Sequence, residues 1–172
     1  MADMVNMAGQ SPNEPLRGAS PLFLREPEIR RGVELLFFGY SHLTRAIDER
    51  LAAEHLGRAH HRALYFIARQ PDLTVSDLLA TLAITKQSLG RVLNDLSERG
   101  LVESRTGERD RRQKLLRLTE AGKAIEAELF ESLRERLSAA YSKAGQDAVG
   151  GFWLVLEGLL PEAERQRIAG AR

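Results

Sequence analysis

The chain has 172 residues, enough for one domain, and 43% of them are hydrophobic and 28% charged, as in an ordinary globular protein. The formal net charge is only +1, so an argument for nucleic-acid binding must rest on where the charges lie. The sequence contains no cysteine, which excludes disulfides, thiolate zinc sites and cysteine-based catalysis or redox switching.

Residues 1–27 predict a flexible N-terminal arm, because four of the six prolines stand there among Ser, Asn, Gly and Glu. The arm has neither the basic start nor the apolar segment of a secretory signal. The longest apolar run of the chain, residues 152–156, is far too short to span a membrane. We therefore expect a cytoplasmic protein with no membrane partner.

Residues 28–57 predict a long dimerisation helix. Apolar residues recur every three or four positions from Ile29 to Leu51, and Gly57 is a suitable stop. A helix of about seven turns is long for a domain of this size, and another long helix is usually needed to cover its apolar stripe. This stripe therefore favours an interface with a second helical element.

Residues 58–118 predict a compact central unit that begins with short helices. The first helix, over residues 58–70, ends before a proline. Thr74, followed three residues later by Asp77, predicts a capping box that opens a second helix reaching about residue 82.

The central unit continues with a third helix and a hairpin. After a brief turn, Thr85 is a good N-cap for a helix to about residue 99, and Gly100 is its C-terminal glycine. Two short strands follow at 101–105 and 114–118, and the polar segment between them suits a hairpin tip.

Residues 119–172 predict C-terminal dimerisation helices. Thr119 caps a long helix that is interrupted at Gly145, and a last helix covers about residues 146–168, with Pro161 weakening its boundary. The apolar stripes of the terminal helices are wider than a small central unit can cover. They predict a homodimer with a helical interface.

Two helices joined by a tight turn and followed by a basic hairpin form a DNA-reading unit, in which the second helix enters the major groove. Gln pairs bidentately with adenine, Lys or Arg pairs with guanine, and Ser or Thr bonds to bases or phosphates. The candidate DNA-binding residues at the start of this helix are Thr85, Lys86, Gln87, Ser88 and Arg91. Gly90 lies on or near the same face, and close approach to DNA or to a neighbouring helix would explain it.

The hairpin tip concentrates positive charge, which suits contact with phosphates or the minor groove. The candidate DNA-binding residues of this tip are Arg105, Arg109, Asp110, Arg111 and Arg112. A carboxylate near phosphates is repulsive unless it is neutralised. We therefore expect Asp110 to brace the tip through an arginine or backbone N–H groups, and Arg112 to point toward DNA.

The order and spacing of four sequence motifs resemble the MarR family. These motifs are L-T-x-S-x-L at 73–78, L-x-x-L-x-x-R-G-L-V at 93–102, D-R-R at 110–112 and L-T-x-x-G at 118–122. With the flanking helices, the resemblance covers about residues 28–168. It implies a mainly α-helical fold with a small β-hairpin wing, that is, a winged helix-turn-helix flanked by long dimerisation helices.

The resemblance also implies a pseudo-twofold dimer on a palindromic operator, often with repression that a small ligand relieves. By position, Asp110 and Arg112 match wing residues of the family, whereas Ala83 stands in a turn where glycine is common. Ligands in this family commonly sit between the dimerisation helices and the winged helix. Residues that could line such a site here are Phe38, Tyr40, His42, Arg45 and Tyr65.

We expect no enzymatic activity, because the sequence has no phosphate-binding glycine loop, HExxH or GxSxG motif. We expect no cofactor, and we read the neighbouring His55, His60 and His61 as solvated rather than as metal ligands. The predicted function is sequence-specific regulation of transcription on double-stranded DNA, with a possible small-molecule effector. The alternative is a winged helix that binds proteins and does not read DNA, against which the basic wing argues.

Overall fold

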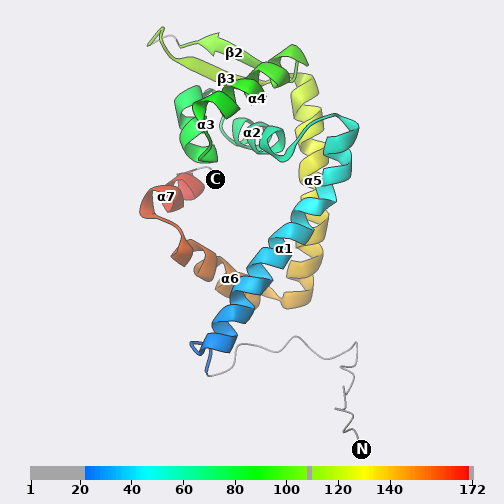
Figure 1. Cartoon of the computed structure of the whole chain (residues 1–172), viewed down its shortest axis with the longest axis vertical. Coiled ribbons are helices and arrows are strands. Elements are labelled where there is room, and N and C mark those ends of the chain that lie inside the picture. The colour runs from blue at the N-terminus through cyan, green and yellow to red at the C-terminus, as the bar shows by residue number, and fades with distance from the viewer. Residues whose placement is uncertain (1–21, 108–109, 171–172) are drawn as a thin grey trace, which may run out of the picture. The chain divides into compact units, whose positions relative to one another are not determined.

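The computed structural model describes residues 22–107 and 110–170 of the chain (Figure 1). Contacts divide the chain into two compact units, Met1–Gly39 and Tyr40–Arg172. The predicted arm therefore lies mostly outside the described residues. Helix α1 (Glu26–Ala53) begins two residues before the predicted start at Glu28. Pro27 lies in its first turn, where the backbone N–H that proline lacks would have no partner within the helix.

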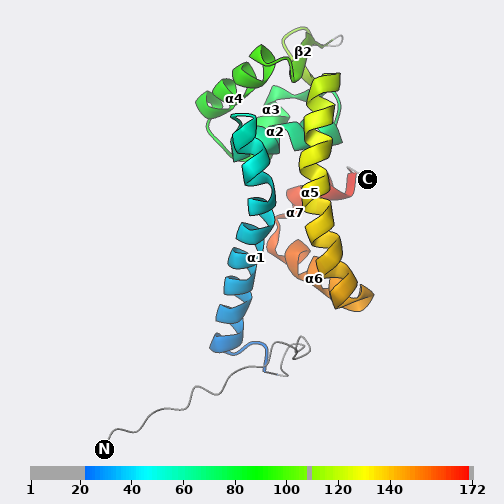
Figure 2. The ribbon, with the colours of Figure 1, turned by 90° about the vertical axis from the view of Figure 1, so that its right-hand side faces the viewer.

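The second unit contains a winged helix, shown at the top of Figures 1 and 2. The three-stranded antiparallel sheet has the order β1-β3-β2, and Val102 of β2 pairs with Leu118 of β3. Strand β1, which the sequence analysis missed, has only two residues and pairs Leu73 with Leu116. In chain order the elements are α2 (Arg58–Arg69), β1 (Leu73–Thr74), α3 (Val75–Leu82), α4 (Lys86–Glu98), β2 (Val102–Thr106) and β3 (Lys114–Leu118).

One apolar core holds the winged helix together. Every helix and strand of the winged helix contributes to it, and the last turns of α1 and the first half of α5 (Glu120–Ala144) close it from the sides. Burial of such side chains contributes about 1.5–3 kcal/mol each. The largest fully buried side chains are Ile47, Leu64, Ile67, Leu78, Leu82, Leu89, Leu96 and Leu129.

Side chains cap helices α3 and α4 largely as the sequence predicts. Thr85 Oγ1 accepts the N–H of Ser88 at 3.1 Å, and Thr74 Oγ1 accepts the N–H of Asp77 at 3.0 Å. The capping box at Thr74 is incomplete, because the Asp77 carboxylate binds the Thr74 hydroxyl instead of the Thr74 N–H. The turn between α3 and α4 places Ala83 in the left-handed region at φ 50°, the conformation for which glycine is usual.

The predicted helix over residues 146–168 is two helices, α6 (Gln146–Leu159) and α7 (Glu162–Gly170). Pro161 separates them, because proline disfavours the helical conformation of the preceding residue. Leu160 is accordingly extended, at φ −92° and ψ 142°. Figure 2 shows α5 running from the winged helix toward α6.

Large apolar side chains remain exposed in each unit. In the first unit they lie on the start of α1, where Val33, Leu35 and Phe37 are more than half exposed. In the second unit they lie on α6, which buries none of its residues and exposes Phe152 and Trp153 among others. Within the described part of the chain, no helix has the length and apolar character that crossing a membrane requires.

Candidate nucleic-acid interface

The first turns of α4 present a polar face to solvent. The opposite face is apolar, and Leu89, Val92 and Leu96 anchor it in the core. Lys86, Gln87 and Arg91 are exposed, and no hydrogen bond or ion pair within the described ranges occupies their side chains. Long polar side chains on a rigidly packed helix, with their donors and acceptors unengaged, are the chemistry that base-edge recognition needs.

Thr85 and Ser88 share one hydrogen-bonded cap at the start of this face. The Thr85 hydroxyl donates to Ser88 Oγ at 2.9 Å while its oxygen accepts the Ser88 N–H. The Thr85 hydroxyl is therefore committed to the cap, and the proton of the Ser88 hydroxyl is directed elsewhere. Of the two, Ser88 is the residue that can donate to a phosphate or a base.

Gly90 lies in the middle of the exposed face, between Gln87 and Arg91. A Cβ atom added at Gly90 would have no neighbour within 4 Å among the described residues. Close packing against a neighbouring helix of the same chain therefore does not explain the glycine. Close approach of another molecule to this face remains as an explanation.

The wing tip is braced by Asp110, as the charge pattern predicts. Asp110 Oδ1 accepts the backbone N–H of Arg112 at 3.0 Å and its Nε at 3.2 Å. The arginine that contacts Asp110 is Arg112 itself, the residue that the charge pattern predicts to point toward DNA. The Arg112 side chain is nonetheless 92% exposed, so this ion pair is weak and can open toward a phosphate.

The remaining arginines of the wing lie in different settings. Arg111 is exposed and makes no ion pair in the described part of the chain, whereas Arg109 lies outside the described residues. Arg105 forms a bidentate ion pair with Asp72, in which Nε donates to Oδ1 at 3.0 Å and Nη2 donates to Oδ2 at 2.9 Å. Charge counting along the sequence therefore overestimated how many wing arginines are unpaired.

Asp72 also binds Arg117 and so forms a clamp at the base of the wing. Arg117 approaches the same two oxygens at 2.7 and 2.5 Å, and the Asp72 N–H donates to Leu116 O at 3.0 Å. The hydrogen bonds from Arg117 and then Arg105 lower the pKa of Asp72 to about 2. The sequence analysis missed Asp72 and Arg117. The hairpin itself gave no signal for this contact, because the residue paired directly with Arg117 is Glu103 and Asp72 lies outside the hairpin.

The clamp predicts a distinct pH dependence of stability. We expect Asp72→Asn to lower the free energy of unfolding at neutral pH, because two guanidinium groups lose their carboxylate. The pKa of Asp72 is lowered on folding, so its contribution is complete above the unfolded value near 3.8 and disappears as the pH falls toward 2. Urea unfolding of both proteins between pH 7 and 2 should show their difference shrinking over this interval. A difference that is independent of pH would contradict the clamp.

Of the five residues predicted to line a ligand site, Phe38 lies in the first unit, and the other four do not come together in one cavity. Tyr65 lines a pocket of about 470 Å³ bounded by α2, α3 and α7, but Tyr40, His42 and Arg45 are exposed on α1 and do not line it. Arg167 of α7 also lines this pocket, and its Nη1 lies 3.5 Å from Thr81 Oγ1. No cluster of three or more His, Cys, Asp or Glu side chains that could hold a metal ion occurs among the residues that the structure describes.

This geometry, with a capped exposed helix beside a braced basic hairpin, defines a winged helix-turn-helix protein. The model of the MarR family matches residues 56–113. The HTH-type transcriptional regulator PetP of Rhodobacter capsulatus is 49% identical over 149 residues, which is 87% of this chain and 90% of that protein. The chain belongs to the MarR family of transcriptional regulators.

Solved structures show the same fold at lower identity. A MarR variant from E. coli complexed with operator DNA is 24% identical with a TM-score of 0.62, and the match covers 83% of this chain and 100% of that one. FabT of Streptococcus pneumoniae in complex with DNA is 20% identical with a TM-score of 0.67, and the match covers 76% and 94% of the two chains. The expected fold, a winged helix-turn-helix with a small sheet in a mainly helical chain, is confirmed.

Proposed function

We propose that this protein reads the sequence of double-stranded DNA as a homodimer on a palindromic operator. The observation that carries the proposal is the exposed face of α4, on which Lys86, Gln87 and Arg91 have no polar partner among the described residues while the opposite face is buried. In this proposal Gln87 and Arg91 contact base edges, and Ser88 and the wing residues Arg111 and Arg112 contact phosphates.

The comparisons support the proposal by analogy, since a MarR variant and FabT with this fold are both seen with DNA. The alternative, a winged helix that binds only proteins, lacks such support. It also leaves the cations Lys86 and Arg91, which have no polar partner among the described residues, without a role on the exposed face of α4.

The homodimer is proposed from the apolar side chains that the two units leave exposed. Phe37 of the first unit and Phe152 and Trp153 of the second are exposed among the described residues of their own unit. A monomeric protein rarely exposes so many large apolar groups, and a second copy can bury them. Static light scattering at micromolar concentration should give the dimer mass. Phe152→Asp should shift it toward the monomer, and a wild-type monomer would contradict the proposed assembly.

Selection of bound duplexes from a random pool tests the DNA-reading proposal. A dimer with two reading helices should enrich an inverted repeat whose half-sites lie about one helical turn apart, roughly 34 Å. Random duplex recovered without an enriched sequence would show that α4 does not read bases.

We also propose an effector site, centred on Tyr65 and the pocket between α2, α3 and α7. Tyr65 and Phe66 offer aromatic surface, and Arg167 offers a guanidinium at the same pocket. This combination suits a small apolar molecule that carries an acidic group, and about 470 Å³ is a typical volume for such a site. Benzoate is a simple probe, whose binding by calorimetry should be lost in Arg167→Ala. Tyr40, His42 and Arg45 would take part only if the dimer brings them to the pocket.

A further inference from the structure

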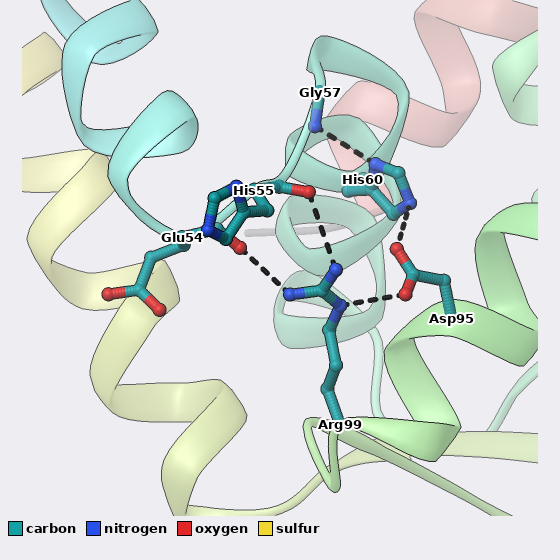
Figure 3. Close-up of polar contacts among 6 residues, drawn as sticks. All are labelled: Glu54, His55, Gly57, His60, Asp95 and Arg99. Atoms are coloured by element: carbon teal, nitrogen blue, oxygen red, sulfur yellow. Dashed lines mark hydrogen bonds and ion pairs between the residues drawn. The ribbon is translucent and has the colours of Figure 1, made fainter.

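Three helix ends meet in one hydrogen-bonded assembly around Asp95 (Figure 3). The N–H of Gly57 donates to His60 Nδ1 at 3.0 Å, and His60 Nε2 lies 3.0 Å from Asp95 Oδ2. Arg99 Nε donates to the other oxygen of Asp95 at 2.7 Å, and its Nη1 donates to the carbonyl of Glu54 at 2.9 Å. The turn between α1 and α2 is thus bonded at both of its ends to α4.

Each contact in this assembly has a defined proton. Since His60 Nδ1 accepts an amide N–H, the proton of a neutral imidazole is on Nε2 and is donated to Asp95. The guanidinium of Arg99 is the main cause that holds the pKa of Asp95 below its ordinary value, so this carboxylate is ionised at neutral pH. Each of its two oxygens therefore serves a different donor.

The turn depends on these side chains for its backbone hydrogen bonds. The last carbonyls of a helix lack partners within it, and Arg99 supplies a donor to Glu54 O at the end of α1. At the start of α2, the His60 side chain accepts the N–H of the N-cap residue Gly57, which is the contribution of the third helical residue to a capping box. Arg99 is itself the C-cap residue of α4, so Asp95 connects the ends of α1, α2 and α4.

We propose that Asp95 is a positioning residue for DNA recognition, which fixes the orientation of α4 relative to the end of α1 through Arg99 and His60. The inference rests on the proposed function, because α4 carries Gln87 and Arg91. A mismatch of orientation would weaken base contacts, which need correct geometry, more than phosphate contacts, which tolerate adjustment.

Electrostatics alone gives the opposite expectation, which makes the inference testable. Asp95 is a negative charge on the helix that faces DNA, so its removal should strengthen binding if only charge counted. Asp95→Asn keeps the size of the side chain but replaces one acceptor oxygen with an NH2 group, which cannot accept a hydrogen bond from His60 or Arg99. Glu98→Gln is the matched control, because it removes an exposed charge from the same helix outside the assembly.

The affinities to compare are those for a duplex selected by the wild-type protein and for a shuffled duplex of the same composition. We expect Asp95→Asn to lower the ratio of the two affinities about tenfold, as for loss of a charged hydrogen bond. We expect Glu98→Gln to leave that ratio unchanged. Arg99→Lys, which keeps the charge but loses the guanidinium fork, should lower the ratio as Asp95→Asn does, and it serves if Asp95→Asn fails to fold.

A measurement without DNA checks the assembly itself. In Asp95→Asn, we expect the Gly57 amide to exchange hydrogen faster and nitrogen NMR to show a shifted His60 Nε2 signal, because the carboxylate that accepts its proton is lost. A wild-type pattern at both sites would overturn the inference, as would an unchanged affinity ratio in both Asp95→Asn and Arg99→Lys. If the wild-type protein prefers no duplex, the proposed function fails and the inference fails with it. If the wild-type protein has a preference and both variants retain it, only the inference fails.

Discussion

Gly122→Ala is expected to lower the free energy of unfolding by about 3 kcal/mol, the upper part of the range for overpacking. Gly122 lies in the first turn of α5, and a Cβ atom there would come within 2.0 Å of the Leu101 carbonyl oxygen. That oxygen accepts the N–H of Thr119 at 3.1 Å, and the Thr119 hydroxyl donates to Gly100 O at 2.6 Å. The obstacle is backbone held by hydrogen bonds, so it cannot move aside cheaply.

Gly90→Ala provides the control, with an effect of the opposite sign. Gly90 is inside α4 and has open space around it within the described residues, so alanine should raise stability by about 0.5–1 kcal/mol through helix propensity. Urea unfolding of the two variants measures both effects. A Gly122→Ala protein as stable as the wild type would contradict the close contact between the first turn of α5 and the Leu101 carbonyl oxygen.

Gln87→Ala and Arg91→Ala are each expected to cost about 1–3 kcal/mol of discrimination between the selected operator and other sequences. Both side chains extend from the exposed face of a helix that three buried residues hold in place, and neither has a competing partner in the described ranges. Competition binding against duplexes with single changed base pairs measures this loss. Each variant should become indifferent to change at the positions that its side chain reads.

Arg111→Ala is the comparison for these two variants. Arg111 is an exposed wing arginine without an ion pair among the described residues, so we assign it to phosphates. Its loss should weaken binding equally on all sequences and reduce the salt slope by about one unit. If Gln87→Ala and Arg91→Ala behave in the same way as Arg111→Ala, the face of α4 contacts only the DNA backbone.

The local elements could be predicted because their signals are local. Thr85 and Thr119 cap the helices that follow them, and Gly100 takes the left-handed conformation at φ 67° that ends α4. The motif L-T-x-x-G also identified Gly122, although only the structure shows that the Leu101 carbonyl is the reason for it. Strand β1 was missed because two residues are too few to show an alternating pattern.

The pairing of charges could not be predicted, because it depends on residues that are far apart in the chain. Asp72 meets Arg105 and Arg117 only after the sheet has formed, and sequence alone counted Arg105 as available for DNA. Likewise, the interpretation of His60 as a solvated histidine was wrong, because folding places it against Asp95 of another helix with a side chain 19% exposed. Periodicity indicates which face is polar, and tertiary packing decides which polar groups are already engaged.

The salt dependence of binding to operator and to random duplex, measured in one titration series, tests the central claim most directly. If α4 and the wing together read DNA, random duplex should bind at low salt with an affinity that falls steeply as salt rises. The selected operator should bind at least about a thousandfold more tightly at physiological salt. Weak binding to both duplexes with no salt dependence would contradict the account and would favour a winged helix that binds only proteins.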